Sequence, residues 1–329
     1  MSKVVFLSGQ PPQAADIFMK CQPEGFEVAS YSSRLTDEEK MALLSDVEYL
    51  VLHPAELSER VLREAKRLRF IQLLTAGYDK IDLNVTGELG IPVATNGGAN
   101  AWSVAEHTIS LLLALYKKIM QGDASVRAGT WRKPITGFNT YEVAGKTVGI
   151  LGAGNIGGKV ARRLKSFETE ILYCDVNAVK DLEQQLGARK VGLDELLSQS
   201  DIISIHMPLL PETRAMINAE KIALMKHNAV LINTSRAEVV DEQALTDALR
   251  EQRILGAGLD VFGHEPINID NPLLQLDNVV LSPHIAGHGY EGWGRRFSVA
   301  WDNIQAVAKG KKPKFLVTAK QPLYKTNEV

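Results

Sequence analysis

The amino-acid sequence predicts an α/β protein made of two doubly wound domains, each built on a parallel sheet. Short apolar, β-rich runs alternate with helical patterns along the chain, which is the signature of parallel α/β units. The chain has 329 residues, which is more than one hydrophobic core usually serves. We therefore expect two domains of roughly 100 to 200 residues each.

The first hundred residues contain four apolar runs that are bounded by turn or charged residues. We expect these runs to be strands over residues 4–7, 49–52, 70–74 and 91–94. Thr36, followed by Glu39, offers a capping start for one helix, and residues 58–67 carry apolar side chains at helical spacing. A long amphipathic helix begins near Ser103 and runs through Ile119, and residues 129–145 then look like a connection over the surface.

The second half of the chain has the pattern of a complete doubly wound domain. We expect strands over residues 147–151, 171–174, 202–205, 229–232, 255–260 and 279–281, with helices over 156–167, 180–186 and 242–251. A final amphipathic helix, about residues 292–308, has no further strand to cover in this domain. It is therefore predicted to return to the first domain.

The composition excludes several classes of partner and site. A formal net charge of -2 leaves no basic surplus for a phosphate backbone or an anionic bilayer, so neither nucleic acid nor membrane is expected as a partner. No apolar run reaches the roughly 20 residues that span a bilayer, and the run at residues 4–7 is too short for a signal sequence. Cys21 and Cys174 lack metal-ligand spacing, so we expect no metal site, no disulfide framework and a reducing cytoplasm.

A glycine-rich turn follows the predicted strand at 147–151 and opens a helix; it reads Gly152-Ala153-Gly154-Asn155-Ile156-Gly157. The first glycine permits a tight turn, the second lets backbone approach a pyrophosphate, and the third lets helix and strand pack closely. Asp175 ends the next strand about twenty residues on, where a carboxylate would bind an adenosine ribose. Its charge would repel a 2′-phosphate, so NAD is favoured over NADP, although Lys180 lies nearby in sequence. A glycine turn of an unrelated α/β protein is the alternative.

Three further candidates follow predicted strands. Arg236 could grip a carboxylate through two parallel hydrogen bonds, or else lie at the surface and cap the next helix. His284 could move protons at neutral pH, with Glu265 fixing its tautomer and favouring its charged form. Ketone reduction needs this pair, because the imidazolium gives the developing alkoxide its proton. Spacing alone leaves a structural or solvent role open for each residue.

Other histidines compete with this assignment. His288 is the main rival because it lies only four residues from His284. His206 follows the strand at 202–205 and is placed to line a cofactor cleft, whereas His107 within the long helix is expected to be packed or at the surface. No supporting context was found for the remaining three, His53, His227 and His264.

Taken in order, eight segments resemble the D-isomer specific 2-hydroxyacid dehydrogenase family, which is NAD-dependent, over nearly the whole chain. The segments are Ala76-Gly77-Tyr78-Asp79, Ser103-Val104-Ala105-Glu106-His107-Thr108, Val126-Arg127-Ala128-Gly129-Thr130-Trp131, the glycine turn, His206-Met207-Pro208-Leu209, Asn233-Thr234-Ser235-Arg236, Gly258-Leu259-Asp260-Val261-Phe262 with Glu265-Pro266, and Pro283-His284-Ile285-Ala286-Gly287.

The resemblance implies an oxidoreductase that transfers a hydride between NAD(H) and a small 2-hydroxy or 2-oxo acid. It implies a discontinuous substrate domain, residues 1–100 plus 296–329, and an NAD-binding Rossmann domain, residues 101–295, with the active site in the cleft between these Rossmann-like or flavodoxin-like domains. It also implies the roles argued above for Arg236, Glu265 and His284. A homodimer formed through the region of the long helix is expected.

The resemblance also supplies binding residues. Backbone amides around Ala76 and Gly77 would join Arg236 and His284 in binding the substrate. The expected cofactor-binding residues are Val104, Gly152, Gly154, Asn155, Ile156, Gly157, Asp175, His206, Pro208, Thr213, Thr234, Arg236, Asp260, His284 and Gly287.

Five residues depart from the family's pattern. Ala237 stands where glycine is usual after the arginine, and a bulkier wall follows the histidine at His288, Tyr290 and Trp293. Trp102 is large for the loop that approaches the nicotinamide. Two readings stay open: these residues shape an unusual substrate pocket, to which Trp102 and His288 would contribute, or they pack at a domain seam.

Two other functions share these sequence features. A phosphite dehydrogenase-like enzyme could use an arginine and an acid-paired histidine on an anionic phosphorus substrate. A non-catalytic NAD-sensing protein, like the corepressors that resemble this family, would bind the dinucleotide without turnover. A formate enzyme is a weak alternative, since it would carry glutamine in place of Glu265.

Overall fold

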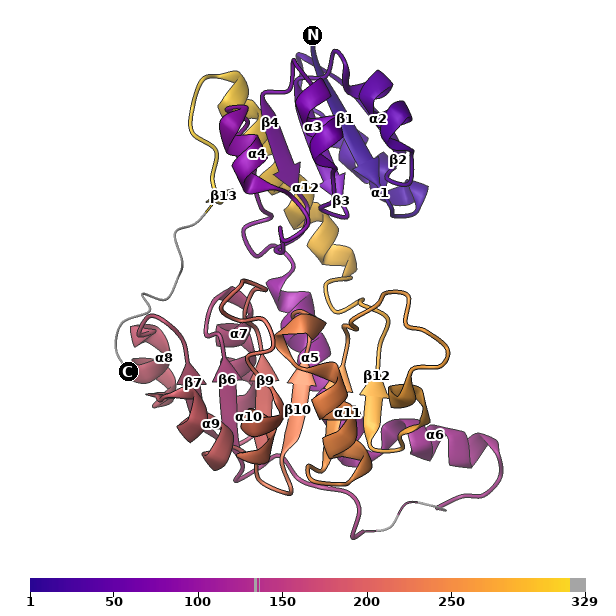
Figure 1. Cartoon of the computed structure of the whole chain (residues 1–329), viewed down its shortest axis with the longest axis vertical. Coiled ribbons are helices and arrows are strands. Elements are labelled where there is room, and N and C mark those ends of the chain that lie inside the picture. The colour runs from indigo at the N-terminus through magenta and orange to yellow at the C-terminus, as the bar shows by residue number, and fades with distance from the viewer. Residues whose placement is uncertain (133–134, 136, 320–329) are drawn as a thin grey trace. The chain divides into compact units, whose positions relative to one another are not determined.

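The computed structural model describes residues 1–132, 135 and 137–319, which form two units (Figure 1). Unit 1 comprises Met1–Asn100 and the described chain from His288 onward, and unit 2 comprises Ala101–Gly287. The sequence had suggested residue 296, rather than His288, as the return to the first unit. Each unit contains a parallel sheet flanked by helices, so the predicted two-domain α/β class is confirmed.

The sheet of unit 1 has six strands. Their order across the sheet is β2 (Phe26–Ser32), β1 (Ser2–Ser8), β3 (Tyr49–His53), β4 (Phe70–Leu73), β5 (Val93–Ala94) and β13 (Leu316–Val317). The first five pair in parallel, and β13 pairs antiparallel with β5. The order 2-1-3-4-5 is that of flavodoxin-like sheets. The sequence did not predict β2, because only Phe26 of this edge strand is buried and no apolar run marks it.

Five helices flank this sheet: α1 (Pro12–Lys20), α2 (Asp37–Leu44), α3 (Glu59–Glu64), α4 (Leu83–Glu88) and α12 (Tyr290–Ala308). The hydroxyl of Thr36 accepts the Glu39 amide at the start of α2, and the Glu39 carboxylate accepts the Thr36 amide, so the predicted capping box is confirmed. Apolar side chains of α2, α3 and α4 pack on one face of the sheet, and those of α1 and α12 pack on the other.

Helix α12 completes the core of unit 1, as the sequence predicted. The ring centroid of Phe297, which is fully buried, lies 5.3 Å from that of Phe18. Trp301 stacks on Phe18 at 4.6 Å, and its indole nitrogen donates to the carbonyl oxygen of Phe18 at 3.2 Å. The unit therefore holds together segments that are 283 residues apart in the chain.

The sheet of unit 2 has seven strands, all parallel. Their order is β8 (Arg189–Lys190), β7 (Glu170–Cys174), β6 (Thr147–Leu151), β9 (Ile202–Ile205), β10 (Val230–Asn233), β11 (Gly256–Leu259) and β12 (Val279–Leu281). Counted within the unit this is 3-2-1-4-5-6 with a seventh strand added, the dinucleotide-binding order. The six strands predicted in this half are all present, with ends shifted by at most two residues in the way such boundaries usually vary.

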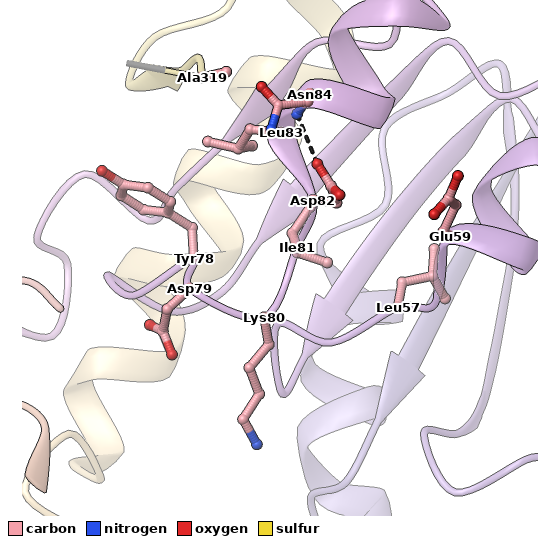
Figure 2. A pocket seen from close by; sticks show the side chains of 10 residues that line it. All are labelled: Leu57, Glu59, Tyr78, Asp79, Lys80, Ile81, Asp82, Leu83, Asn84 and Ala319. Atoms are coloured by element: carbon pink, nitrogen blue, oxygen red, sulfur yellow. Dashed lines mark hydrogen bonds between the residues drawn. The ribbon is translucent and has the colours of Figure 1, made fainter. Parts of the chain in front are cut away.

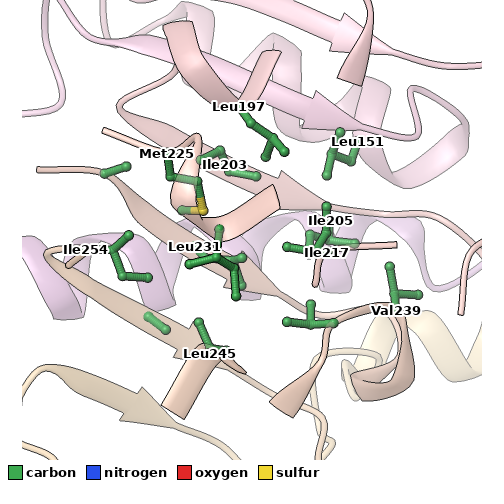
Figure 3. Packing of buried hydrophobic residues seen from close by; sticks show 14 of the residues in the cluster. Leu151, Leu197, Ile203, Ile205, Ile217, Met225, Leu231, Val239, Leu245 and Ile254 are labelled. Atoms are coloured by element: carbon green, nitrogen blue, oxygen red, sulfur yellow. The ribbon is translucent and has the colours of Figure 1, made fainter. Parts of the chain in front are cut away.

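Helices cover both faces of this sheet: α5 (Ala101–Lys117), α7 (Asn155–Lys165), α8 (Lys180–Leu186), α9 (Leu193–Gln199), α10 (Ala219–Ala223) and α11 (Glu242–Arg250), with the 3-10 turns η1 (Ala237–Val239) and η2 (Pro272–Gln275). Helix α6 (Ile119–Arg127) does not cover the sheet, since Ser125 is its one buried residue. Apolar residues of α9, α10 and α11 pack on one face (Figure 3), and those of α5, α7 and α8 pack on the other. None of the described helices is both long and apolar enough to cross a membrane.

The long helix predicted near Ser103 is divided in two. It ends at Lys117, and Lys118 has a φ of 54°, a left-handed conformation that stops the helix before α6 begins. The predicted connection at residues 129–145 contains positions 133, 134 and 136, which lie outside the described residues. Its described residues form turns and irregular chain without a helix or strand, as the sequence suggested.

We expect Phe297→Ala to lower the free energy of unfolding of unit 1 by about 3–5 kcal/mol, because truncation leaves a cavity among stacked rings. Ser298→Ala is the matched control: its side chain is exposed on the same helix, so its effect should stay within about 0.5 kcal/mol. Hydrogen exchange of the β1 and β4 amides measures both. Equal effects of the two variants would show that α12 does not stabilise this core.

Candidate active site

The predicted functional residues of unit 2 lie at the carboxyl edge of its sheet. Because every strand is parallel, the residues that follow the strands share one edge, where α/β sheets bind ligands. They are Gly152 after β6, Asp175 after β7, His206 after β9, Thr234 and Arg236 after β10, Asp260 after β11 and His284 after β12. Ala76 and Gly77 follow β4 in unit 1, where Thr75 Oγ1 donates to the Gly77 carbonyl at 2.7 Å, and their part in substrate binding stays a prediction.

The glycine turn has the geometry that a bound pyrophosphate requires. Gly152 has a φ of 86°, and a Cβ there would lie 2.9 Å from backbone atoms of His206. A Cβ on Gly157 would lie 2.0 Å from the Gly152 carbonyl oxygen, so helix and turn touch at this point. The Cβ position of Gly154 faces open space, in front of the first amides of α7. These residues, with Asn155 and Ile156 opening the helix, fit a dinucleotide phosphate.

Asp175 is tied to the glycine turn. Its Oδ2 accepts the amide of Ala153 at 2.8 Å, and its Oδ1 accepts the amide of Asn177 at 3.1 Å. The Lys190 amine donates to the carbonyl of Val176 at 3.2 Å, close to this carboxylate in the chain. The carboxylate is thus fixed at the strand end where an adenosine ribose would bind.

His206 is a neutral, partly buried imidazole beside the glycine turn. Its Nε2 lies 2.8 Å from Ser204 Oγ, and its Nδ1 is buried without a hydrogen-bond partner among the described residues. Burial lowers the pKa of His206 to about 3. It therefore brings no positive charge to this side of the site at neutral pH.

Other predicted cofactor residues are held by short hydrogen bonds. Thr213 Oγ1 donates to the Pro208 carbonyl at 2.7 Å. Thr108 Oγ1 donates to the Val104 carbonyl at 2.8 Å and lies 3.0 Å from Thr234 Oγ1. The first bond lies within the loop after β9, and the Thr108–Thr234 contact joins the residues after β10 to α5. The contacts of these residues, and of Gly287, with a cofactor stay predictions.

His284 and Glu265 form the pair that the sequence suggested. His284 Nδ1 lies 2.7 Å from Glu265 Oε2, and Glu265 Oε1 accepts the amide of Phe262 at 3.1 Å. Burial raises the pKa of Glu265, but the bond and charge of His284, the Phe262 amide and the charge of Arg236 together lower it below its ordinary value. An ionised carboxylate can only accept, so Nδ1 carries a proton and Nε2 is left to act on a ligand.

The buried carboxylate of Asp260 shapes the loop that carries His284. Asp260 Oδ1 accepts the amide of Ile285 at 2.9 Å, and Oδ2 accepts that of Ala286 at 2.8 Å. The carbonyl of Asp260 accepts the amide of His284 itself at 2.8 Å. His284 has a φ of 52°, a left-handed conformation that costs on the order of 1–3 kcal/mol and persists only where neighbours enforce it.

His107 was expected to be a packed or surface residue, but it contacts this loop. Its Nε2 lies 2.8 Å from Ser282 Oγ, and the Ser282 hydroxyl donates to Asp260 Oδ1 at 2.6 Å. Sequence reasoning missed the contact because His107 and Ser282 are 175 residues apart, and helical periodicity gives only the face on which a side chain lies.

Arg236 sits in a tight, hydrogen-bonded turn after β10. Asn233 Nδ2 donates to the Arg236 carbonyl at 2.9 Å, and Asn233 Oδ1 accepts the amide of Ser235 at 3.0 Å. Arg236 Nη1 donates to the Ser235 carbonyl at 2.8 Å. Ala237, which stands in place of the family's usual glycine, begins η1 and is buried without a positive φ, so its Cβ fits this backbone.

Two of the bulky residues that depart from the family pattern, Trp102 and Trp293, pack within their own units. Trp102, half exposed at the start of α5, has Lys159 Nζ 4.8 Å and the Arg163 guanidinium 5.0 Å from its ring. In unit 1, the Trp293 ring lies 5.2 Å from that of His53, which is itself 6.5 Å from the His288 ring. Tyr290 is exposed. A role of these residues in substrate choice stays a prediction.

Unit 1 also contains a pocket beside the segment Ala76–Asp79 (Figure 2). Its lining includes Tyr78, Asp79 and Lys80, but neither Ala76 nor Gly77. Asp82 on its wall accepts the Asn84 amide at 2.9 Å and caps α4. No group of three metal-ligating side chains occurs among the described residues. The described residues that line the pocket all belong to unit 1.

Comparisons with known proteins show which family the chain resembles. Residues 109–286 match the family described as the D-isomer specific 2-hydroxyacid dehydrogenase, NAD binding domain. The chain is 39% identical to a glyoxylate reductase of Korarchaeum cryptofilum over 89% of this chain and 90% of that protein. It is 42% identical to a glyoxylate reductase of Thermofilum pendens over 82% of this chain and 80% of that protein. The NADPH-dependent glyoxylate/hydroxypyruvate reductase of Sinorhizobium meliloti is similar in structure, with a TM-score of 0.83 and 27% sequence identity. The match covers 96% of this chain and 98% of that chain.

Gly157→Ala should abolish tight NADH binding, because the new methyl group would lie 2.0 Å from the Gly152 carbonyl and force the turn apart. Gly158→Ala is a matched control, since its Cβ would meet its nearest neighbour, the Ala153 carbonyl, at an ordinary 3.6 Å. Fluorescence titration with NADH measures both dissociation constants. If the two variants bound NADH equally well, the close contact in the turn would have no part in cofactor binding.

Proposed function

Because the chain belongs to the D-isomer specific 2-hydroxyacid dehydrogenase family, we propose that it reduces a small 2-oxo acid with NADH, using His284 as acid/base, Glu265 as its partner and Arg236 as substrate anchor. The chain is an oxidoreductase that transfers hydride between a nicotinamide dinucleotide and 2-hydroxy acids. The 2.7 Å contact between His284 Nδ1 and Glu265 carries the assignment of residues, because it gives one histidine the tautomer and charge partner that the reaction needs.

His284 acts through Nε2 on the oxygen of the 2-oxo carbonyl group. As negative charge develops on that oxygen, the Nε2–H group donates its proton, and in the reverse reaction neutral Nε2 accepts the proton of the hydroxyl. The carboxylate of Glu265 stabilises the imidazolium from which the proton leaves. Left-handed backbone at His284 aims the ring, and the loop bonds to Asp260 keep it there.

Arg236 binds the carboxylate of the substrate. A planar guanidinium forms two parallel hydrogen bonds to a carboxylate, which fixes the adjacent carbonyl as well as the acid. Arg236 also contributes to lowering the pKa of Glu265, so the two charges are near each other on adjacent strand ends. An anchor beside the acid/base pair orients the ketone for reduction.

The glycine turn, Asp175 and the loop after β9 would hold the dinucleotide, which supplies the hydride when bound. The carboxylate of Asp175 supports NAD over NADP, because it would repel a 2′-phosphate at the ribose site. The Sinorhizobium meliloti relative uses NADPH, so the preference for NAD or NADP depends on the residues that each protein places around the ribose site.

The glyoxylate reductases of Korarchaeum cryptofilum and Thermofilum pendens, which align over most of the chain, favour a 2-oxo acid of similar small size. The matches do not favour a phosphite dehydrogenase or a non-catalytic NAD sensor. A homodimer and a cytoplasmic location are further proposals. The location is supported by Cys21 and Cys174, neither of which forms a disulfide.

His284→Ala should lower kcat by about 10²- to 10⁴-fold with NADH binding kept, as expected on loss of a general acid. Arg236→Lys should mainly raise KM for the 2-oxo acid, because one ammonium cannot replace the planar fork. The assay follows NADH oxidation with glyoxylate, hydroxypyruvate, pyruvate and bulkier 2-oxo acids. His288→Ala, the control, should keep wild-type rates. If His288→Ala loses turnover while His284→Ala stays active, then His288 is the acid/base.

The value of kcat/KM should be at least about tenfold higher with NADH than with NADPH, since a carboxylate facing a phosphate costs more than about 1.4 kcal/mol. Asp175→Ser should narrow this ratio by improving use of NADPH. Asp181→Ser, which removes an exposed carboxylate on the next helix, serves as the control and should leave the ratio unchanged. Equal efficiency of the wild-type enzyme with both cofactors would contradict the proposed NAD preference.

A further inference from the structure

Three side chains from distant parts of unit 2 form a connected group beneath the His284 loop. His107 comes from α5, Ser282 follows β12 and Asp260 follows β11. Ser282 Oγ lies 2.8 Å from His107 Nε2 and 2.6 Å from Asp260 Oδ1, and His107 Nε2 is 3.5 Å from the same carboxylate oxygen. The reaction proposed above assigns no function to His107 or Ser282.

The direction of the hydrogen bonds follows from what each group can donate. The carboxylate of Asp260 offers only lone pairs, so the single proton of the Ser282 hydroxyl points to it. The serine oxygen must then accept a hydrogen bond from His107, whose Nε2 must carry a proton in either charge state. The chain of donation therefore runs from His107 through Ser282 to Asp260.

Because Asp260 is buried, the hydrogen bonds that run from His107 through Ser282 to its carboxylate are important for the loop that carries His284. The side chain of Asp260 is 1% exposed, so its charge depends on protein donors instead of water. Its other donors are the amides of Ile285 and Ala286, directly after His284. His107, with 23% of its side chain exposed, is near enough to balance the carboxylate charge when protonated. The donor from Ser282 fixes one end of the loop and the two amides fix the other.

We propose that His107 is a positioning residue for the reductase: by donating to Ser282 it keeps that hydroxyl on Asp260 and so holds the loop that presents His284. The inference rests on the proposed role of His284. Without the Nε2 donor, the Ser282 hydroxyl can turn to other partners, and the strained backbone of His284 loses part of its support. A shift of about 1 Å in a reacting group can cost about 10²-fold in rate.

Two replacements separate donation from packing. His107→Phe keeps a ring but removes the donor, and His107→Gln carries an amide nitrogen that can reach the place of Nε2. We expect His107→Phe to lower kcat about tenfold or more, with KM for the 2-oxo acid and Kd for NADH unchanged within about twofold. His107→Gln should recover most of kcat. His227→Phe, at an exposed position before β10, is the control and should match the wild type.

A double variant tests whether His107 acts through Ser282. Ser282→Ala should lower kcat, and adding His107→Phe should lower it no further, because both changes break one chain of donation. If the fold-losses in kcat of the two single variants multiply in the double variant, the two side chains act independently and the proposal is overturned. So would a wild-type kcat in His107→Phe, or equal losses in His107→Phe and His107→Gln, which would indicate packing alone.

His284→Ala, assayed in parallel, distinguishes this inference from the proposed function. If that variant keeps wild-type turnover, the acid/base assignment fails whatever His107 does. If it is inactive while His107→Phe is fully active, the acid/base assignment stands and only the positioning role is refuted.

Discussion

The candidate site of unit 2 depends on one buried carboxylate. Asp260 accepts hydrogen bonds from two backbone amides and from one side chain, Ser282, of a single loop, and that loop carries His284 in a left-handed conformation. Burying an ionised group is favourable only when its lone pairs are satisfied, so the loop must adopt the shape that satisfies them. The same geometry turns the imidazole toward Glu265. The hydrogen bonds that the buried Asp260 carboxylate requires therefore also determine where the His284 imidazole lies.

Parallel topology explains why residues so far apart in the chain act together. Every strand of unit 2 ends at the same edge, so the glycine turn, Asp175, Arg236 and His284 need no long loops to meet there. The close contact of Gly157 with the Gly152 carbonyl sets the start of α7 against this edge. Precision in the site therefore comes from regular strands and short turns.

The sequence predicted most strands and the residues at their ends, because apolar runs and turn residues are local signals. It missed β2, whose side chains are largely exposed, and it extended one helix across Lys118, where left-handed backbone ends it. The Glu265–His284 contact was expected only as one option, since the two residues are 19 positions apart and β12 lies between them in the chain. The role of Ser282 was beyond local patterns, because its partners become neighbours only after β11, β12 and α5 have packed.

The discontinuous build of unit 1 has a consequence for how the protein is made. Phe18 leaves the ribosome long before Trp301, the ring on which it stacks, and 283 residues must be translated between them. At typical synthesis rates this interval is on the order of tens of seconds. During that time one face of the nascent sheet has no α12 to cover it, whereas unit 2 emerges as one continuous segment. The nascent chain therefore gives the dinucleotide-binding half the first opportunity to fold, and leaves exposed aromatic rings for chaperones to shield.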